Sequence, residues 1–455
     1  MIQPTRRNFI VGAAAAAAGA TGAIKTRMAF AGPDAEDNNE LLVFVFLRGG
    51  MDGLSLVLPI TGADRSYYET ARSYLAVPNT GPDAALALDG IFGINPNAAP
   101  LHDLYQANHL AIVVAAGMTE ANRSHFDAME FIERGTPGNK LTSTGWLTRH
   151  LASAPNLPPE IIMPSISVGS VQATSLLGDM NTINISDPDS FNLQVGPWEW
   201  RSAQRVALRH LYTQDSTWLH QAGLQTLDAV DIVELNTGGN YVPSNGAVYP
   251  SGSFGDHLQV VAQMTKLDLG LRVATIDLGG WDTHEGQGDQ GQGYFGGEIS
   301  DLAQGLKALY TDLDGSGASN YTGRMTVVVQ SEFGRRLREN ADHGTDHGHG
   351  NLMLVMGGNT NGGIHGQWPG LANEDLYDGA DLAVTTDFRR VLSEILIRRM
   401  GNNKLGVVFP GYADYQPLGI VTGVDLPPDY SADGSAIFND GLESGDTSRW
   451  SLTTG

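Results

Sequence analysis

Imidazoles and carboxylates gather in one segment of the chain, between two stretches of strand-forming residues. Three of the twelve histidines, His343, His347 and His349, fall within seven positions, and Asp346 adjoins His347. In extended backbone, positions i and i+2 face the same way, so His347 and His349 could turn to one ion. The alternative is a hydrophilic turn that happens to be rich in His. Because the chain has no cysteine, a metal site must rest on imidazole and carboxylate ligands.

A second group of the same type occurs upstream, in GGWDTHEGQG, where one residue separates an Asp from a His. A lone Asp after a strand is usually a turn or cap residue, so the inference rests on two His/Asp groups rather than on any one side chain. The pattern predicts one or two divalent ions, with Zn²⁺ or Mn²⁺ favoured and Mg²⁺ or Ca²⁺ as alternatives. The candidate ligands in these groups and at the neighbouring strand end are Asp282, His284, Glu332, Asp346, His347 and His349.

Ser124 begins a helical pattern and is the candidate nucleophile. A hydroxyl at a helix N-terminus is aimed at the place where the helix stabilises a bound phosphate or sulfate. The same position also suits a plain helix cap. His125 and Asp127 at the start of this helix, and Arg48 at the end of the first strand, are candidate contacts to an anionic substrate. Ordinary helix-start and solvated residues are the alternatives for these three.

Strand-forming and helical segments alternate along most of the chain. Apolar runs predict strands at 41–47, 109–116, 271–280, 325–330 and 352–357. Amphipathic segments predict helices at 97–107, from 124, and at 258–269, 299–313 and 388–400. This alternation predicts an α/β fold, with a mostly parallel central sheet flanked by helices on both faces. Sites in such sheets gather at the carboxyl ends of the strands, where most of the candidate residues fall.

The N-terminal residues, 1–31, differ from this α/β pattern. They combine the pair Arg6–Arg7 with a weakly apolar Ala/Gly stretch and a small-x-small ending, Ala29-Phe30-Ala31. This resembles a twin-arginine export signal. A membrane anchor is the alternative, but the apolar stretch is short for a spanning helix, and no later segment suits one. The mature protein is therefore expected in the periplasm, outside the cell or on its surface, after contact with the twin-arginine export machinery.

The rest of the chain divides into a large domain and a tail. Residues 32–424 are expected to form the α/β domain, with a loop-rich insertion at 157–250 that holds a strand at 161–168 and a helix near 200–213. Residues 425–455 are polar and resemble a short ending seen on many secreted bacterial proteins, which suggests a sorting segment. A disordered end is the alternative.

The formal net charge of −23 restricts the partners. The first 31 residues carry four basic side chains and no acid, so the remainder is more acidic still. Such a surface repels phosphate backbones, which disfavours nucleic-acid binding, and it attracts divalent cations. A small-molecule ester is the expected partner, and nothing in the sequence fixes the oligomeric state.

Six motifs together resemble a widespread family of exported bacterial proteins of unknown function. They are FLRGGMDGLSLVLP, NRSHFDAMEFIERG, GWLTRHL, LGGWDTHEGQ, SEFGR and GTDHGHGNLMLVMGG, and with the export signal the resemblance spans residues 1–410. That family is placed in the alkaline phosphatase-like superfamily, with phosphatases, sulfatases and the cofactor-independent phosphoglycerate mutases. The resemblance implies an alkaline phosphatase-like fold.

The order of site elements in that superfamily is preserved along this chain. It implies a metal ligand at Asp52, a nucleophile at Ser124, an Asp and a His at Asp282 and His284, a carboxylate at Glu332, and a final His at His347 or His349. The departure is Phe333, which stands where the superfamily has a His. One ion fits this pattern, as does a second one rebuilt around Asp346, His347 and His349.

Three functions follow from these expectations. The first is an exported metal-dependent hydrolase of phosphate or related esters, with Ser124 as the nucleophile. The second is a non-catalytic alkaline phosphatase-like protein that binds or assembles at the cell surface, which Phe333 and the tail favour. The third is a sulfatase, which ranks lower because the chain has neither a Cys- nor a Ser-x-Pro-x-Arg motif.

Overall fold

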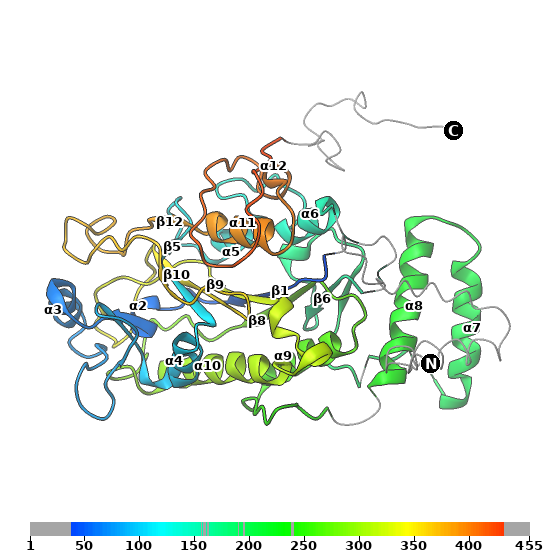
Figure 1. The fold of residues 1–455 in the computed structure, drawn as a ribbon, viewed down its shortest axis with the longest axis horizontal. Coiled ribbons are helices and arrows are strands. Elements are labelled where there is room, and N and C mark those ends of the chain that lie inside the picture. Colours follow the sequence, from blue (N-terminus) through cyan, green and yellow to red (C-terminus); the bar gives the residue numbers. More distant parts are fainter. Residues whose placement is uncertain are drawn as a thin grey trace.

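The structure is a computed structural model that describes residues 38–155, 157, 161, 163–189, 191–193, 196–237 and 241–431. The export signal expected at 1–31 and most of the tail expected at 425–455 lie outside the described residues. The described part contains a nine-stranded sheet between two layers of helices, and a small three-stranded sheet beside it (Figure 1).

The large sheet has the strand order β11-β5-β10-β9-β1-β8-β6-β7, with β12 beside β5. Its strands are β1 (Leu41–Leu47), β5 (Leu110–Gly117), β6 (Ser165–Val168), β7 (Thr182–Asn184), β8 (Val273–Leu278), β9 (Met325–Ser331), β10 (Asn351–Gly357), β11 (Gly363–His365) and β12 (Thr386–Asp387). Among these described strands only β10 is antiparallel to its neighbours, β5 and β9. The predicted α/β fold with a mostly parallel sheet is confirmed.

The reversed direction of β10 matters for the site. Parallel strands end at one edge of the sheet, and an antiparallel strand begins at that edge. The segment before Asn351 therefore joins the segments that follow β1, β5, β8 and β9. The His-rich stretch lies in this segment.

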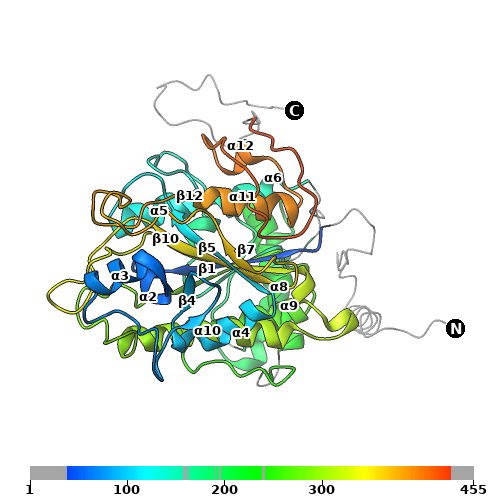
Figure 2. The ribbon, with the colours of Figure 1, turned by 60° about the vertical axis from the view of Figure 1, so that its left-hand side comes forward.

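The central strand β1 is buried on both faces because every residue in LLVFVFL is apolar. Val43 and Val45 point to one face of the sheet, and Phe44 and Phe46 point to the other. Helices α4 (Ala99–Gln106), α9 (Ser253–Lys266) and α10 (Tyr294–Leu313) cover the first face. Helices α5 (His125–Arg134), α6 (Trp146–Ser153) and α11 (Phe388–Arg398) cover the second (Figures 1 and 2).

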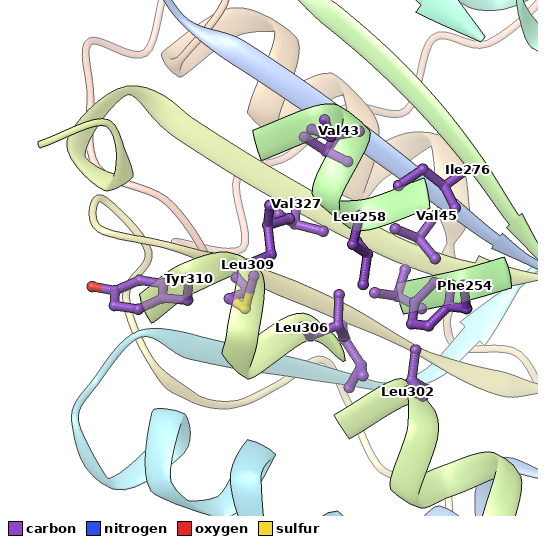
Figure 3. Close-up of a cluster of buried hydrophobic side chains, with 14 of the residues drawn as sticks. Val43, Val45, Phe254, Leu258, Ile276, Leu302, Leu306, Leu309, Tyr310 and Val327 are labelled. Carbon is purple, nitrogen blue, oxygen red and sulfur yellow. The ribbon is translucent and has the colours of Figure 1, made fainter. Parts of the chain in front are cut away.

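Figure 3 shows the core on the first face, where sheet residues meet the two long helices. Val45 of β1 and Ile276 of β8 pack with Leu258 of α9 and with Leu302 and Leu306 of α10. Burying one side chain of this size contributes about 1.5–3 kcal/mol. The core thus fixes the sheet that carries the strand-end segments.

The remaining elements lie around this sandwich. They are α2 (Gly53–Leu56), β2 (Val57–Pro59), α3 (Gly62–Ala71), β3 (Leu86–Ala87), β4 (Phe92–Ile94), α7 (Arg201–Tyr212), α8 (Trp218–Asn236) and α12 (Leu405–Val408), with short 3₁₀ helices at Pro96–Ala98, Thr174–Leu176, Trp198–Trp200, Gly317–Ser319 and Thr322–Arg324. None of the helices in the described ranges combines the length and the apolar character that crossing a membrane requires.

The range 157–250 was expected to be a loop-rich insertion with one strand and one helix. The structure has more helices and strands in this range than expected. Strands β6 and β7 lie within it and extend the large sheet beyond β8. Helices α7 and α8 form a hairpin that projects away from the sheet (Figure 1). Helix α8 has 19 residues and was not predicted.

Candidate metal centre

Four side chains converge at the edge where the parallel strands end. Asp282 and His284 follow β8, His347 precedes β10, and His125 is the first residue of α5. Asp282 Oδ1 lies 3.3 Å from His125 Nε2, 3.1 Å from His284 Nε2 and 3.2 Å from His347 Nε2. The Nε2 atoms of His284 and His347 are 2.8 Å apart. Ligand atoms of His125, Asp282 and His347 all lie within 4.8 Å of one another. We call these four side chains the His/Asp cluster.

In all three imidazoles of the cluster the other ring nitrogen, Nδ1, faces a hydrogen-bond acceptor. The pairs are His125 with Glu332 Oε1 at 2.7 Å, His284 with Asp346 Oδ1 at 3.1 Å, and His347 with the backbone carbonyl oxygen of Arg123 at 2.8 Å. A carbonyl oxygen can only accept, so Nδ1 of His347 carries the proton and Nε2 presents a lone pair in the neutral ring. Carboxylates favour the same arrangement in the other two rings. Such outer hydrogen bonds orient metal-ligating histidines.

The donor atoms of the cluster fit a divalent cation. With Nδ1 protonated, the lone pairs of His284 and His347 face each other at 2.8 Å beside an ionised carboxylate. A positive charge between these atoms removes their mutual repulsion. Nε2 of His125 is buried and has no hydrogen-bond partner among the described residues, so an ion would satisfy it as well. Three imidazole nitrogens and one carboxylate oxygen suit Zn²⁺ or a similar ion.

Asp282 is held in its ionised form by Arg335. Arg335 Nη2 donates to Asp282 Oδ1 at 2.6 Å. Partial burial tends to raise the pKa of Asp282, but the hydrogen bond and charge of Arg335 outweigh it and lower the pKa to about 2. The buried Arg335 also donates to the carbonyl oxygens of Gly49, Gly50 and Thr345 at 2.5–2.7 Å. It therefore ties the segment after β1 to the segment before β10.

Phe333 forms an apolar wall of the cluster. Its ring centroid lies 4.9 Å from that of His125 and 5.0 Å from that of His347. The approach requires glycine at position 50, where φ is +61° and a Cβ atom would lie 2.5 Å from Phe333 Cε2. Phe333 thus packs where the superfamily pattern has a further His, and it shields one side of the imidazoles from water.

The structure brings together part of the predicted ligand set. Asp282, His284 and His347 lie in the cluster. Glu332 is fully buried, and its Oε1 accepts from His125 and from the backbone N–H of Gly49 at 2.9 Å. Asp346 faces the far side of the ring of His284. These two carboxylates therefore orient imidazoles instead of facing the common point.

Asp52 and His349, two further predicted ligands, lie outside the cluster. Asp52 is fully buried, and Arg72 donates to its two oxygens at 2.6 and 2.9 Å. Burial would raise the pKa of Asp52, but Arg72 outweighs it and the pKa is lowered. His349 instead packs against Tyr377, with ring centroids 4.3 Å apart and the ring planes tilted by 39°. His347 and His349 do not turn to one point because the segment before β10 is irregular, not extended.

The predicted substrate contacts make other interactions. His125 belongs to the His/Asp cluster itself. Arg48 donates to Glu133 at 2.9 Å, and Asp127 pairs with Lys140. In this state neither Arg48 nor Asp127 presents a free charge to an anion.

Ser124 occupies the N-cap position of α5, next to His125. Its side chain is exposed, and its hydroxyl makes no capping hydrogen bond. The backbone N–H of Ser124 donates to Asn122 Oδ1 at 2.8 Å. The helix-cap interpretation therefore does not account for this hydroxyl, which remains available for chemistry.

Two residues that shape the site were missed in the sequence. Arg123 contributes its backbone carbonyl. Every residue has this group, so the residue type gives no indication of the contact. Arg335 lies in the SEFGR motif, but a buried arginine looks the same in a sequence as a surface one. The only available signal was its position three residues after Glu332 at a strand end.

Replacing Asp52 with Ala is expected to destabilise the fold without releasing metal. The change leaves the guanidinium of Arg72 fully buried and unpaired, which costs about 3–5 kcal/mol. Urea unfolding and elemental analysis measure the two effects. Glu69→Ala is the control, because that carboxylate is half exposed in its pair with Arg65 and should contribute no more than about 1 kcal/mol. Loss of metal at unchanged stability would instead make Asp52 a ligand.

Replacing Glu332 with Gln is expected to change metal binding in two opposite ways. The amide keeps an acceptor for His125 Nδ1 but loses the charge, so affinity near pH 8 should fall about 10–100-fold. The hydrogen bond to Glu332 raises the pKa of His125, more than burial lowers it. A proton therefore competes for Nε2 up to a higher pH in the wild type, and binding weakens as pH falls through that raised pKa.

When the affinity of each protein is expressed relative to its own value at pH 8, the Gln variant should lose affinity at a lower pH than the wild type does. Chelator competition with Zn²⁺ across a pH series measures both effects. Glu130→Gln, on the same helix and paired with Arg134, should alter neither. An unchanged pH dependence in Glu332→Gln would show that His125 does not bind the ion.

These features define an α/β protein with a His/Asp group suited to a cation at its strand ends. Residues 250–406 match the family model described as "Protein of unknown function (DUF1501)". This segment contains Asp282, His284 and His347. No curated protein matches the chain.

Two solved structures show a distant similarity. One is the lipoteichoic acid synthase LtaP from Listeria monocytogenes, with 10% identity, a TM-score of 0.32, and coverage of 88% of this chain and 81% of that one. The other is the PsFucS1 sulfatase from Pseudoalteromonas sp., with 12% identity, a TM-score of 0.30, and coverage of 93% and 75%. At these identities and TM-scores, neither structure indicates the function of this chain.

Proposed function

We propose that the protein is an exported metal-dependent hydrolase of phosphate or related esters, with an alkaline phosphatase-like fold. The observation that carries the proposal is the convergence of three imidazole Nε2 atoms on Asp282 Oδ1, with an acceptor at the Nδ1 of every ring. We assign one divalent ion to this point, with Zn²⁺ or Mn²⁺ favoured. The export assignment rests on residues 1–31, and it implies the periplasm or the cell exterior.

The chain's own groups have distinct roles in this proposal. A divalent ion bound by the cluster supplies positive charge to the transferring group and lowers the pKa of a nucleophile beside it. Ser124 precedes the ligand His125, and the N-terminus of α5 favours an anionic group at the same place. Arg335 holds Asp282 in position, and Phe333 excludes water from one side of the rings.

The proposed reaction has two steps. The Ser124 oxygen forms a bond to phosphorus as the ester P–O bond breaks, and the alcohol leaves with the serine proton. Water then cleaves the serine phosphate, which restores Ser124 and releases phosphate. Phosphorus can be replaced by sulfur in the same scheme.

Metal analysis combined with a substrate panel tests the proposal. The exported protein should carry close to one Zn²⁺ or Mn²⁺ per chain, and should hydrolyse at least one aryl phosphate, phosphodiester or aryl sulfate. Chelation should stop turnover, and restoring the ion should recover it. A metal-loaded protein that turns over none of these esters would favour a binding protein. A protein without metal that shows no thermal shift with Zn²⁺, Mn²⁺, Mg²⁺ or Ca²⁺ would contradict the metal centre.

A further inference from the structure

Helix α7 turns its charged side toward the protein and its uncharged side toward solvent. Arg205 Nη1 lies 2.7 Å from Asp231 Oδ1 on α8, and Arg209 lies 2.6 Å from both Asp228 Oδ1 and Asp231 Oδ2. The third arginine of α7, Arg201, pairs with Glu234 at 3.2 Å. All three arginines of α7 are therefore neutralised along the seam with α8.

The opposite side of α7 carries no Asp, Glu, Lys or Arg, and the exposed His210 lies on it at helical spacing from Val206 and Ala207. We call five exposed residues, the N-cap Trp200 and four of the helix itself, the outer face of α7: Trp200, Ala203, Val206, Ala207 and Leu211. Trp200 is 60% exposed, Val206 69% and Leu211 59%, and no residue of α7 is buried. A surface helix ordinarily has the reverse pattern, with apolar residues inward and charged residues outward. A contiguous apolar patch that is exposed to solvent in this way is typical of a binding surface.

We propose that the outer face of α7 binds the same face of a second copy of this chain. The chain carries a formal net charge of −23, so two copies repel each other over most of their surface. The outer face carries no Asp, Glu, Lys or Arg, and the arginines behind it are already paired. A symmetric contact through this face is therefore the approach with the smallest electrostatic cost.

The order of side chains along α7 suits a two-fold axis. In an antiparallel pair centred between residues 205 and 206, Trp200 of one copy lies opposite Leu211 of the other, and the reverse contact is identical, as a two-fold interface requires. Ala203 and Ala207 between these bulky ends allow helix axes to approach to about 8–10 Å. With α8 behind each α7, the two hairpins form a four-helix arrangement. The hairpin projects from the body of the molecule (Figure 1).

A lipid surface fits this face less well. Interfacial helices that bind anionic membranes carry Lys or Arg beside their apolar face. The outer face of α7 carries neither, and the net charge of the chain opposes an anionic surface.

The size of the contact predicts a weak dimer. A stable interface buries about 800 Å² on each partner, and a helix of this length spans only about 18 Å. We therefore expect dissociation in the micromolar range.

Sedimentation velocity of the exported protein tests this inference. The wild type should shift from monomer to dimer across the micromolar range, and Val206→Glu should weaken the dimer at least tenfold by placing like charges near the axis. Because Val206 is 69% exposed, the variant should keep its melting temperature. Val171→Glu is the control, since Val171 is 76% exposed outside the hairpin, and it should dimerise normally. A wild type that stays monomeric, or a dimer that Val206→Glu leaves intact, would overturn the inference.

Cysteine cross-linking gives an independent measurement, because the chain has no cysteine of its own. Val206→Cys should form a covalent dimer under mild oxidation, and Val171→Cys should remain monomeric. Absence of the Val206 cross-link would count against the two-fold arrangement. If the monomer instead floats with phosphatidylcholine vesicles and Val206→Glu abolishes flotation, the face binds lipid and the dimer proposal fails.

Discussion

Replacing Asp282 with Ala is expected to empty the metal centre and abolish ester hydrolysis. Asp282 Oδ1 is the point on which His125, His284 and His347 converge. Without this carboxylate, the buried guanidinium of Arg335 has lost its acidic partner in the cluster and repels a cation placed among the rings. The affinity should therefore fall well beyond the 10–100-fold typical of losing an outer hydrogen bond to a ligand.

Elemental analysis after gel filtration and titration with Zn²⁺ measure this loss. Hydrolysis should fall in the same proportion as metal occupancy. Asp342→Ala is the matched control, because Asp342 is an exposed acid in the segment that leads to the cluster. Its loss should change neither metal nor activity. An Asp282→Ala protein that keeps a full equivalent of ion would place the metal elsewhere.

The strands of the core were readable from the sequence because burial on both faces demands continuous apolar residues. The predicted run 41–47 coincides with β1, and 325–330 and 352–357 agree with β9 and β10 to within a residue. The direction of β10 was not readable, since a buried strand has the same composition in either direction. That direction nevertheless brings the His-rich segment to the site.

The hairpin of α7 and α8 shows the opposite case. Helix α7 was expected near 200–213, and the structure has it at Arg201–Tyr212. Helix α8 was missed because it lies in a region rich in Pro, Asn, Ser and Gly. Asp228, Asp231 and Glu234 of α8 form ion pairs with the arginines of α7. Their role is therefore visible only when the two helices lie side by side. Pairing between two helices is a tertiary fact that local patterns do not contain.

At the site, residue type predicted which donors are present but not which atoms face one point. His125 was expected to contact substrate because it follows Ser124, yet it lies in the His/Asp cluster. Asp52 was expected to bind metal from the order of motifs, yet its partner is Arg72, 20 residues along the chain. Which nitrogen of a ring carries the proton depends on acceptors from other segments, and only the fold brings those together.

Replacing Ser124 with Ala is expected to stop turnover while fold and metal content stay the same. Ser124 precedes His125, a ligand in the proposed metal centre, and its hydroxyl makes no capping hydrogen bond. The free energy of unfolding should therefore change by less than the roughly 1 kcal/mol of a lost cap. Removing a nucleophile that acts with its surrounding groups typically lowers kcat by about 10³-fold or more.

The measurement compares kcat, metal content and melting temperature in metal-loaded protein, with Ser253→Ala as the control. Ser253 is an exposed serine at the start of α9 and should not affect turnover. Acid-quenched wild type should yield a phosphorylated peptide containing Ser124, because the first step transfers phosphorus to its oxygen. Full activity in Ser124→Ala with metal dependence retained would assign the attack to water and leave the metal centre standing. A drop in melting temperature together with lost metal would make Ser124 a structural residue of the site, because only then do fold and cluster depend on its hydroxyl.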